Sequence, residues 1–457
     1  MKRLVFCFDG TWNRLDAICP TNVVITAESV LPLAEDGTAQ LIYYGEGVGT
    51  GKWDRLRGGM FGSGLVQNLA DAYRFLIFNH SPGDEIYIFG FSRGAYTARS
   101  FAGLLGTCGV LLRKNAAQVK DAISLYQARD TSDAFKERVL RFRSSLCPHL
   151  CVSDAEHGWR KSNVPGFDAE KSPKLSVRYV GVWDTVGALG IPKSFSLLNL
   201  TSKRYAFHDV ALSSFVRSAR HAVAIDEHRK DFVPTLWSNL AQLNVDAGAN
   251  ESSNDAPYQQ KWFPGTHSSV GGGGERRGLS DQALDWILDG ARAAGLELDT
   301  GPYSRIYELA PDYTEYVENS IAPSFMYRAM HSFSTVRDGP TRLFEVSVFA
   351  RRRWAAQAEH LRDGVVYRPA TLQKVEGELN EWVRASGQGE QPQSVDNRKL
   401  NYQIHVVAPG DTLSGLAKKF YGDAKAYPRI FDANSNKLDD PNKIFVGSSL
   451  RIPIDES

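Results

Sequence analysis

The chain has 457 residues, of which 42% are hydrophobic and 23% are charged, a usage that excludes disordered and fibrous proteins. With 53 Lys and Arg against 52 Asp and Glu, the formal net charge is +1, so no general electrostatic attraction to nucleic acid is expected. At roughly 150 residues per domain, the length allows two or three domains.

The N-terminus differs from a secretory signal. Its apolar run covers only residues 4–8 before Asp9, whereas a signal peptide needs about 7–15 apolar residues. We therefore expect a protein that is made in the cytoplasm without a signal peptide. The five cysteines have no framework spacing, which fits reduced thiols, and neither a metal nor another cofactor is expected.

The first part of the chain alternates predicted strands and helices. Short apolar runs at residues 4–8, 85–90 and 177–183 predict buried strands. Apolar residues at helical spacing predict helices over residues 68–79 and 95–105. Helix followed by strand, repeated, predicts an α/β fold with a mostly parallel sheet covered by helices.

Ser92 is the candidate nucleophile. It lies in Gly90-Phe91-Ser92-Arg93-Gly94, between a predicted strand and a predicted helix. That context is typical of a nucleophile elbow, a tight turn that projects the serine hydroxyl above the sheet. The alternative is a glycine-rich turn with an idle serine.

The serine needs a base, and in this architecture the chain order is Ser, then Asp or Glu, then His. Asp184 directly follows the strand predicted at residues 177–183, and His267 lies in a glycine-rich loop between aromatic residues. The alternatives are a helix-capping aspartate and a loop histidine bonded to backbone. His221 and His228 flank a segment that looks helical, and we expect structural roles for them.

The turn after the first predicted strand is the candidate oxyanion hole. Its backbone N–H groups at Gly10 and Thr11, together with that of Arg93, are placed to bind the oxyanion. The alternative is an ordinary turn at the end of a strand.

Polar residues 385–402 predict a linker between a large domain, residues 1–384, and a small one, residues 403–457. In the small domain, Ile404 and Val406 alternate as in a strand, and a helix is expected to begin near Thr412. Residues 427–433 predict a second helix, and residues 449–452 a final strand.

Taken together, the motifs resemble those of the DUF2235 family of α/β-hydrolases, which includes the type 1 lipase effectors of the type VI secretion system. The resemblance extends over most of residues 1–370. It rests on residues 8–13, 90–99, 181–187 and 262–267, with residues 278–281 and 367–370 in support.

This resemblance implies a phospholipase that cleaves phospholipid acyl esters of bacterial membranes with a Ser92–Asp184–His267 triad. It also implies export by a specialised secretion system to the periplasm or cell envelope, with a secretion-system spike protein and an immunity protein as partners. Ser269 stands where the family usually has Asp, and Gly274 where it has Tyr. We expect these departures to alter rate or substrate.

The C-terminal unit resembles a LysM module, which implies a βααβ fold and binding of peptidoglycan or another N-acetylglucosamine-containing glycan. The alternative for this unit is an assembly or ion-binding role. For the whole chain, the alternatives are a carboxylesterase for another substrate, or an inactive hydrolase-fold adaptor that binds glycan. The expected glycan-binding residues are Gly410, Asp411, Thr412, Leu413 and Asn434.

Overall fold

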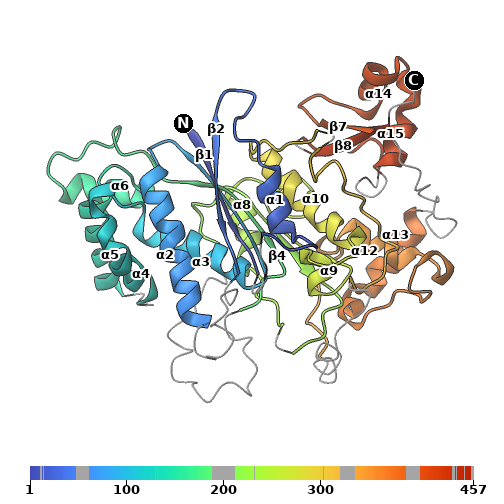
Figure 1. Cartoon of the computed structure of the whole chain (residues 1–457), viewed down its shortest axis with the longest axis horizontal. Helices are drawn as coiled ribbons and strands as arrows, with labels where there is room; N and C mark the ends of the chain where they lie inside the picture. The colour runs from blue at the N-terminus through green and yellow to red at the C-terminus, as the bar shows by residue number, and fades with distance from the viewer. Residues whose placement is uncertain are drawn as a thin grey trace.

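The structure is a computed structural model of the chain. Its helices and strands form a large body around one parallel sheet and a small C-terminal unit around a second sheet (Figure 1). It describes residues 1–10, 13, 15–47, 61–128, 130, 132–187, 211–230, 232–301, 303–319, 335–386, 402–434, 438, 440–446 and 448–453.

A six-stranded sheet forms the centre of the large body. Its strands are β1 (Lys2–Phe8), β2 (Ala39–Gly45), β3 (Glu85–Phe91), β4 (Val177–Trp183), β5 (Ala219–Ala224) and β6 (Tyr258–Phe263). They lie in the order β2-β1-β3-β4-β5-β6, and every neighbouring pair is parallel. The carboxyl ends of the strands therefore share one edge, where Phe91 of β3 lies beside Trp183 of β4.

Alternate side chains of a strand point to opposite faces of the sheet. In β1, Leu4 and Phe6 belong to one apolar cluster, whereas Val5 and Cys7 belong to another. A parallel sheet of this kind buries both faces, and helices cover each of them.

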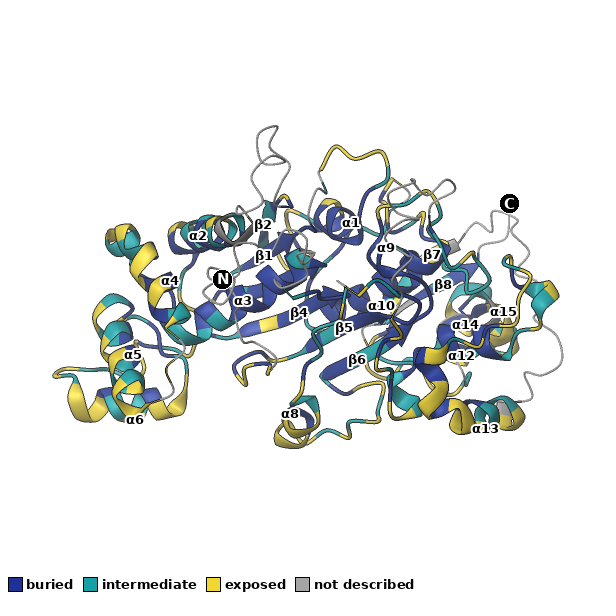
Figure 2. Ribbon diagram, turned by 90° about the horizontal axis from the view of Figure 1, so that it is seen from below, coloured by how far each residue is buried: buried dark blue, intermediate teal, exposed yellow. Residues whose placement is uncertain are grey.

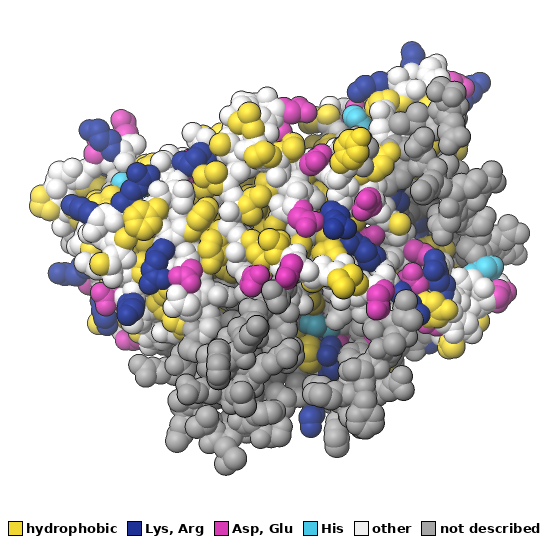
Figure 3. Space-filling view, viewed as in Figure 1, with side chains coloured by type: hydrophobic (Ala, Val, Ile, Leu, Met, Phe, Trp, Pro, Cys, Tyr) yellow, Lys and Arg dark blue, Asp and Glu magenta, His cyan; other side chains and the backbone are white. Residues whose placement is uncertain are grey.

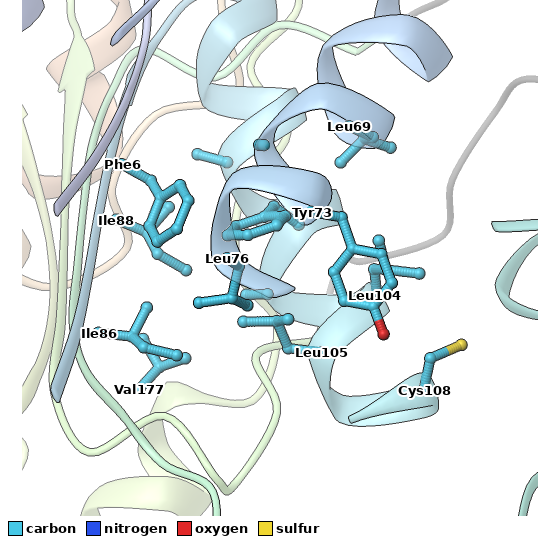
Figure 4. Close-up of a cluster of buried hydrophobic side chains, with 14 of the residues drawn as sticks. Phe6, Leu69, Tyr73, Leu76, Ile86, Ile88, Leu104, Leu105, Cys108 and Val177 are labelled. Atoms are coloured by element: carbon cyan, nitrogen blue, oxygen red, sulfur yellow. The ribbon is translucent and has the colours of Figure 1, made fainter. Parts of the chain in front are cut away.

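The first face is covered by α2 (Phe61–Asn79), α3 (Arg93–Cys108) and α4 (Val119–Gln127). Figure 4 shows Ile86 and Ile88 of the sheet facing Leu76 of α2 and Leu105 of α3. Beyond them lie α5 (Asp133–Leu146) and α6 (Asp154–Asn163), on the left of Figure 1.

The second face is covered by α1 (Asn22–Ser29) and α10 (Gly278–Ala293). The short helix α9 (His267–Gly271) precedes α10 and packs against it. Ile25 of α1 and Ile287 of α10 join Phe89 of β3 in one buried cluster. Figure 2 shows the buried strands between these helices and α2. The serine, aspartate and histidine named above all follow elements of this layered core.

A third cluster joins the chain after α10 to the same sheet. It includes Trp262 of β6 and Ile225 after β5, packed against Trp354 and Leu372. The helices on this side are α12 (Val348–Ala355) and α13 (Glu376–Ser386), and α8 (Leu240–Asp246) lies beside β6. The short 3-10 helices of the large body are η2 (Arg113–Gln118), η4 (Leu343–Glu345), η5 (Ala358–His360) and η6 (Ala370–Val375).

The C-terminal unit has a βααβ order. It consists of β7 (Tyr402–Val406), α14 (Leu413–Tyr421), the 3-10 helix η7 (Ala424–Ala426), α15 (Tyr427–Ala433) and β8 (Ser449–Pro453). β7 and β8 pair antiparallel over a core that includes Leu416, Ile430 and Ile452. Two guanidinium groups join the unit to the large body: Arg352 Nη2 donates to the Leu438 carbonyl at 2.7 Å, and Arg451 Nη2 to the Leu309 carbonyl at 2.6 Å.

The predicted α/β fold with a mostly parallel sheet is confirmed, as is the small βααβ unit. The expectation of a helix around His221 is wrong, because Ala219–Ala224 forms strand β5. This strand is buried on both faces, with Ala222 and Ala224 in one cluster and Val223 in another. The apolar run of this segment, residues 222–225, therefore carries no alternation that would separate strand from helix.

Two surface properties bear on function. In the part of the chain that the structure describes, no helix combines the length and apolar character that crossing a bilayer requires. On the face shown in Figure 3, basic and acidic side chains are interspersed, in keeping with the net charge of +1.

Candidate active site

Ser92 occupies a strained turn between β3 and α3. Its φ of 59° and ψ of −123° lie in a region that L-residues rarely adopt. The flanking glycines are required by close backbone contacts: a Cβ on Gly90 would lie 2.5 Å from the Gly94 carbonyl oxygen, and one on Gly94 would lie 2.2 Å from the Phe8 carbonyl oxygen. Strain of about 1–3 kcal/mol at such a turn persists only when the surrounding structure holds it.

Three side chains from distant parts of the chain form a hydrogen-bonded series. His267 Nε2 lies 2.8 Å from Ser92 Oγ, and His267 Nδ1 lies 2.6 Å from Asp184 Oδ2. All three residues are buried. This is the geometry of a nucleophile, a base and an acid that orients the base.

Asp184 follows β4 and has a φ of 37°; it and Ser92 are the non-glycine residues with positive φ among those that the structure describes. Main-chain hydrogen bonds hold this conformation. The Asp184 N–H donates to the Ala222 carbonyl at 2.7 Å, and the Thr185 N–H donates to His221 Nε2 at 3.2 Å. Both predicted strand-end residues of the site are thus held in unusual backbone conformations.

Arg337 is a member of the site that sequence reasoning missed. Its Nη1 donates to Asp184 Oδ1 at 2.6 Å and its Nη2 to Asp184 Oδ2 at 2.9 Å. The guanidinium also donates to the carbonyls of Ala224 and Phe232. No local motif surrounds Arg337, and it lies 153 positions from Asp184, so nothing in the sequence pattern pointed to it.

The electrostatics of the site favour an ionised aspartate beside a neutral histidine. Burial acts to raise the pKa of Asp184, but the charge of Arg337 and the hydrogen bond from His267 lower it more, leaving it well below its usual range. Burial lowers the pKa of His267, and the opposing effect of Asp184 only partly offsets this. His267 is therefore poised to accept a proton near neutral pH.

The loop that carries His267 is fixed by two acidic residues after β5. Asp226 Oδ2 accepts from the Gly265 N–H at 2.7 Å, and Glu227 Oε2 accepts from the His267 N–H at 3.2 Å. The rings of Phe91 and Phe232 lie 4.6 Å and 4.8 Å from the imidazole, measured between centroids. These contacts hold the imidazole in place and limit access of water to it.

The two departures from the family pattern have clear structural settings. Ser269 is buried, and its hydroxyl donates to the Val317 carbonyl at 2.5 Å. A Cβ on Gly274 would lie 2.4 Å from the side chain of Asn319. Serine and glycine at these positions thus fit the packing of the segment around Val317 and Asn319.

The turn after β1 lies against the serine, since a Cβ on Gly10 would be 3.2 Å from Ser92 Cβ. The Gly10 N–H, however, donates to its neighbour Asp9 Oδ1 at 2.7 Å. Thr11 lies outside the described residues, and Arg93 is the first residue of α3. The oxyanion hole of Gly10, Thr11 and Arg93 therefore stays a prediction. Of its three N–H groups, that of Gly10 already donates to Asp9.

Asp9 organises this turn. Its carboxylate accepts hydrogen bonds from the hydroxyls of Thr21 and Tyr44, each at 2.8 Å, in addition to that from Gly10. Burial raises the pKa of Asp9, and these donors only partly counter the effect.

His221, near the site, has structural contacts. His221 Nδ1 lies 2.9 Å from Gln260 Oε1, and burial lowers the pKa of His221 to about 3. His221 therefore stays neutral and accepts the Thr185 N–H beside Asp184. Within the described ranges, no group of three or more His, Cys, Asp or Glu residues is placed to hold a metal ion.

The predicted glycan-binding residues are divided between surface and core. Gly410 and Thr412 are exposed, and Asp411 Oδ2 accepts from the Ala408 N–H at 2.8 Å and lies 2.7 Å from His405 Nε2. Leu413 and Asn434 are buried. The side chain of Asn434 hydrogen-bonds to the main chain of Ile430 and Arg451, so it stabilises the core of the unit.

The parallel sheet, the strained serine at the start of α3, and the adjacent histidine and aspartate define an α/β-hydrolase-like protein. Residues 2–290 match the family described as "T6SS, Phospholipase effector Tle1-like, catalytic domain", and residues 405–453 match the LysM domain. The first match covers more than half of the chain, which therefore belongs to the Tle1-like phospholipase effector family.

Individual relatives are more distant. An uncharacterised protein of Saccharomyces cerevisiae is 27% identical over 259 residues, 53% of this chain and 33% of the relative. The potassium binding protein Kbp of Escherichia coli is 49% identical over 51 residues, 11% of this chain and 34% of the relative. The matches thus span about a third of the length of these curated relatives. The solved structure of the Tle1 effector bound to the VgrG spike from the type 6 secretion system is 19% identical, with a TM-score of 0.30 over 59% of this chain and 51% of that chain.

Proposed function

We propose that the chain is a serine esterase that hydrolyses the acyl ester bonds of phospholipids. The observation that carries this proposal is the hydrogen-bonded series from Ser92 through His267 to Asp184, built on a strained turn at the carboxyl edge of the sheet. Membership of a phospholipase effector family supports phospholipid as the substrate class.

In the first half of the reaction, Ser92 Oγ attacks the ester carbonyl while His267 Nε2 takes its proton. Asp184 holds the imidazole and stabilises the imidazolium that forms. The negative oxygen is bound by the predicted oxyanion hole, for which Gly10, Thr11 and Arg93 are the candidate N–H donors. When the intermediate collapses, the leaving alcohol, a lysophospholipid, takes the proton from His267, and the acyl group stays on Ser92.

In the second half, His267 takes a proton from a water molecule that attacks the acyl-enzyme carbonyl. Collapse of that intermediate returns the proton to Ser92 Oγ and releases the fatty acid. The net reaction consumes one ester bond and one water.

Family membership also supports a proposal for the biological setting. We infer that the protein is an antibacterial effector delivered by a type VI spike to the envelope of a target cell, with an immunity protein protecting the producer. The family description supports delivery by this secretion system. Survival of a target strain that expresses the protein in its periplasm, compared with its Ser92→Ala variant, tests the antibacterial role.

For the C-terminal unit, we propose peptidoglycan binding through the exposed loop at Gly410, Asp411 and Thr412. The match to the LysM family supports this. A second role, binding of a monovalent cation, is favoured by the 49% identity of a 51-residue segment to the potassium binding protein of Escherichia coli. Binding to purified sacculi and calorimetric titration with potassium chloride separate the two roles.

We propose domain boundaries of 1–384 for the catalytic domain, 385–402 for the linker and 403–457 for the LysM domain. The third apolar cluster supports the first boundary, because it packs residues as late as Leu379 against the sheet. The antiparallel pairing of β7 with β8 supports the last one.

Labelling with a fluorophosphonate tests the serine mechanism, because only an activated serine reacts. We expect label on Ser92 in the full chain and none in the Ser92→Ala variant. Mass spectrometry of phospholipid vesicles after incubation then distinguishes a phospholipase from another esterase. Absence of label would favour the inactive adaptor, and label without lipid hydrolysis would favour a carboxylesterase for another substrate.

A further inference from the structure

The carboxylate of Asp184 has a cationic partner in addition to His267. The guanidinium of Arg337 contacts both of its oxygens, at 2.6 Å and 2.9 Å, as a planar fork. The Ala224 N–H also donates to Oδ1, at 2.9 Å. Since the side chain of Arg337 is 4% exposed and that of Asp184 is fully buried, the pair is shielded from solvent screening.

The guanidinium is itself held by the main chain. Arg337 Nη1 donates to the Ala224 carbonyl at 2.8 Å, and Nη2 donates to the Phe232 carbonyl at 2.6 Å. Ala224 ends β5, and the ring of Phe232 packs edge-on against the imidazole of His267. Arg337 thus links Asp184 to the end of strand β5 and to Phe232, whose ring packs against His267.

We propose that Arg337 is a positioning residue of the catalytic site: its fork fixes the plane of the Asp184 carboxylate and, through it, aims His267 Nε2 at Ser92 Oγ. The inference rests on the proposed esterase function. A carboxylate held by one backbone N–H alone is free to rotate about its last bond. The bidentate contact removes that rotation, so Oδ2 stays in line with His267 Nδ1.

Arg337 also balances the charge of Asp184. The charged groups with the largest effect on His267 are Asp184 after β4, and Glu227 and Arg229 after β5, and Arg337 pairs with Asp184. Loss of Arg337 leaves the negative charge of Asp184 uncompensated beside the imidazole. The protonated imidazole is then favoured, so the base form requires a higher pH.

The test compares Arg337→Met and Arg337→Lys in the full chain, with ester hydrolysis followed across pH. We expect Arg337→Met to lower kcat about 100-fold, the scale of loss for a misplaced catalytic group, and to move the acidic limb of the profile to higher pH. Arg337→Lys keeps the positive charge but lacks the planar fork. We therefore expect this variant to keep the acidic limb near its wild-type pH and to retain part of the rate that Arg337→Met loses.

Arg160 provides a matched control. It is also buried, and it lies on α6, away from the candidate active site. It pairs with Glu156 at 2.6 Å and donates to the carbonyls of Cys147 and Pro148. Arg160→Met is expected to destabilise the protein without moving the pH limb.

The outcomes separate the two proposals. Suppose that Ser92→Ala abolishes hydrolysis but Arg337→Met keeps the wild-type rate and the wild-type acidic limb of the pH profile. The proposed role of Arg337 is then wrong, and the esterase proposal is retained. The role is equally wrong if Arg160→Met and Arg337→Met shift the limb alike. If Ser92→Ala hydrolyses ester as the wild type does, the esterase proposal itself fails.

Discussion

The hydroxyl of Tyr367 donates a 2.8 Å hydrogen bond to Oδ2 of Asp226, which lies 141 positions earlier in the chain. The same oxygen accepts the Gly265 N–H, two residues before His267. Tyr367 therefore anchors the loop that carries the histidine, although it lies outside the hydrogen-bonded series of the site.

Replacing Tyr367 with Phe removes one donor from this buried carboxylate. We expect Tyr367→Phe to lower the free energy of unfolding by about 1–3 kcal/mol, the usual cost of a buried group left with one partner fewer. Urea unfolding measures this. Tyr303→Phe is the control, since Tyr303 is fully exposed; equal stability of the two variants would contradict the anchoring role.

The pH dependence of hydrolysis follows from the lowered pKa of His267. Only the neutral imidazole accepts the serine proton, so activity is lost as pH falls through that pKa. Because burial moves the pKa below the ordinary value of about 6.5, we expect kcat/KM to stay constant down to a pH below 6.5 before it declines. A decline that begins above pH 7 would contradict a buried, neutral base.

The elbow does not tolerate a side chain at Gly94. A Cβ there would lie 2.2 Å from the Phe8 carbonyl oxygen, and backbone cannot give way as a flexible side chain would. We expect Gly94→Ala to cost about 3 kcal/mol of unfolding free energy and to lower esterase activity.

Gly158→Ala in α6 serves as the control for this glycine, because a Cβ at Gly158 meets nothing within 4 Å. Alanine is the better helix former, so this variant should match or exceed the wild type in thermal stability. Comparable losses in both variants would indicate that close backbone contact is not the cause.

In the C-terminal unit, Asn434 bonds to the carbonyls of Ile430 and Arg451 and to the Arg451 N–H. We expect Asn434→Ala to destabilise this unit by about 1–3 kcal/mol, seen as an earlier unfolding transition, while fluorophosphonate labelling of Ser92 is retained. The exposed Asn442→Ala is the control. An unchanged transition in Asn434→Ala would contradict this structural role.

Much of the fold was readable from the sequence because its signals are local. The strands at residues 85–90 and 177–183 are short, mostly apolar runs, and the elbow between β3 and α3 carries its glycines within five residues. Strand β5 was missed because it is buried on both faces and has no alternation. A histidine in its middle, His221, gave no further signal.

The candidate site divides in the same way. Ser92, Asp184 and His267 each follow a recognisable local pattern, and the structure brings them within hydrogen-bonding distance. Arg337 has no such pattern, because its position depends on how the chain after α10 returns to the sheet. The hydrogen bond from the Gly10 N–H to Asp9 could not be predicted from the sequence either, because it depends on the geometry of the turn.

The central claim is that Ser92 is the nucleophile, and turnover of phospholipid vesicles by Ser92→Ala tests it most directly. The proposed mechanism predicts that kcat falls by about 10⁶-fold, as it does when the nucleophile of a triad is removed, while the thermal unfolding temperature stays near that of the wild type. Hydrolysis by Ser92→Ala at the wild-type rate would contradict it.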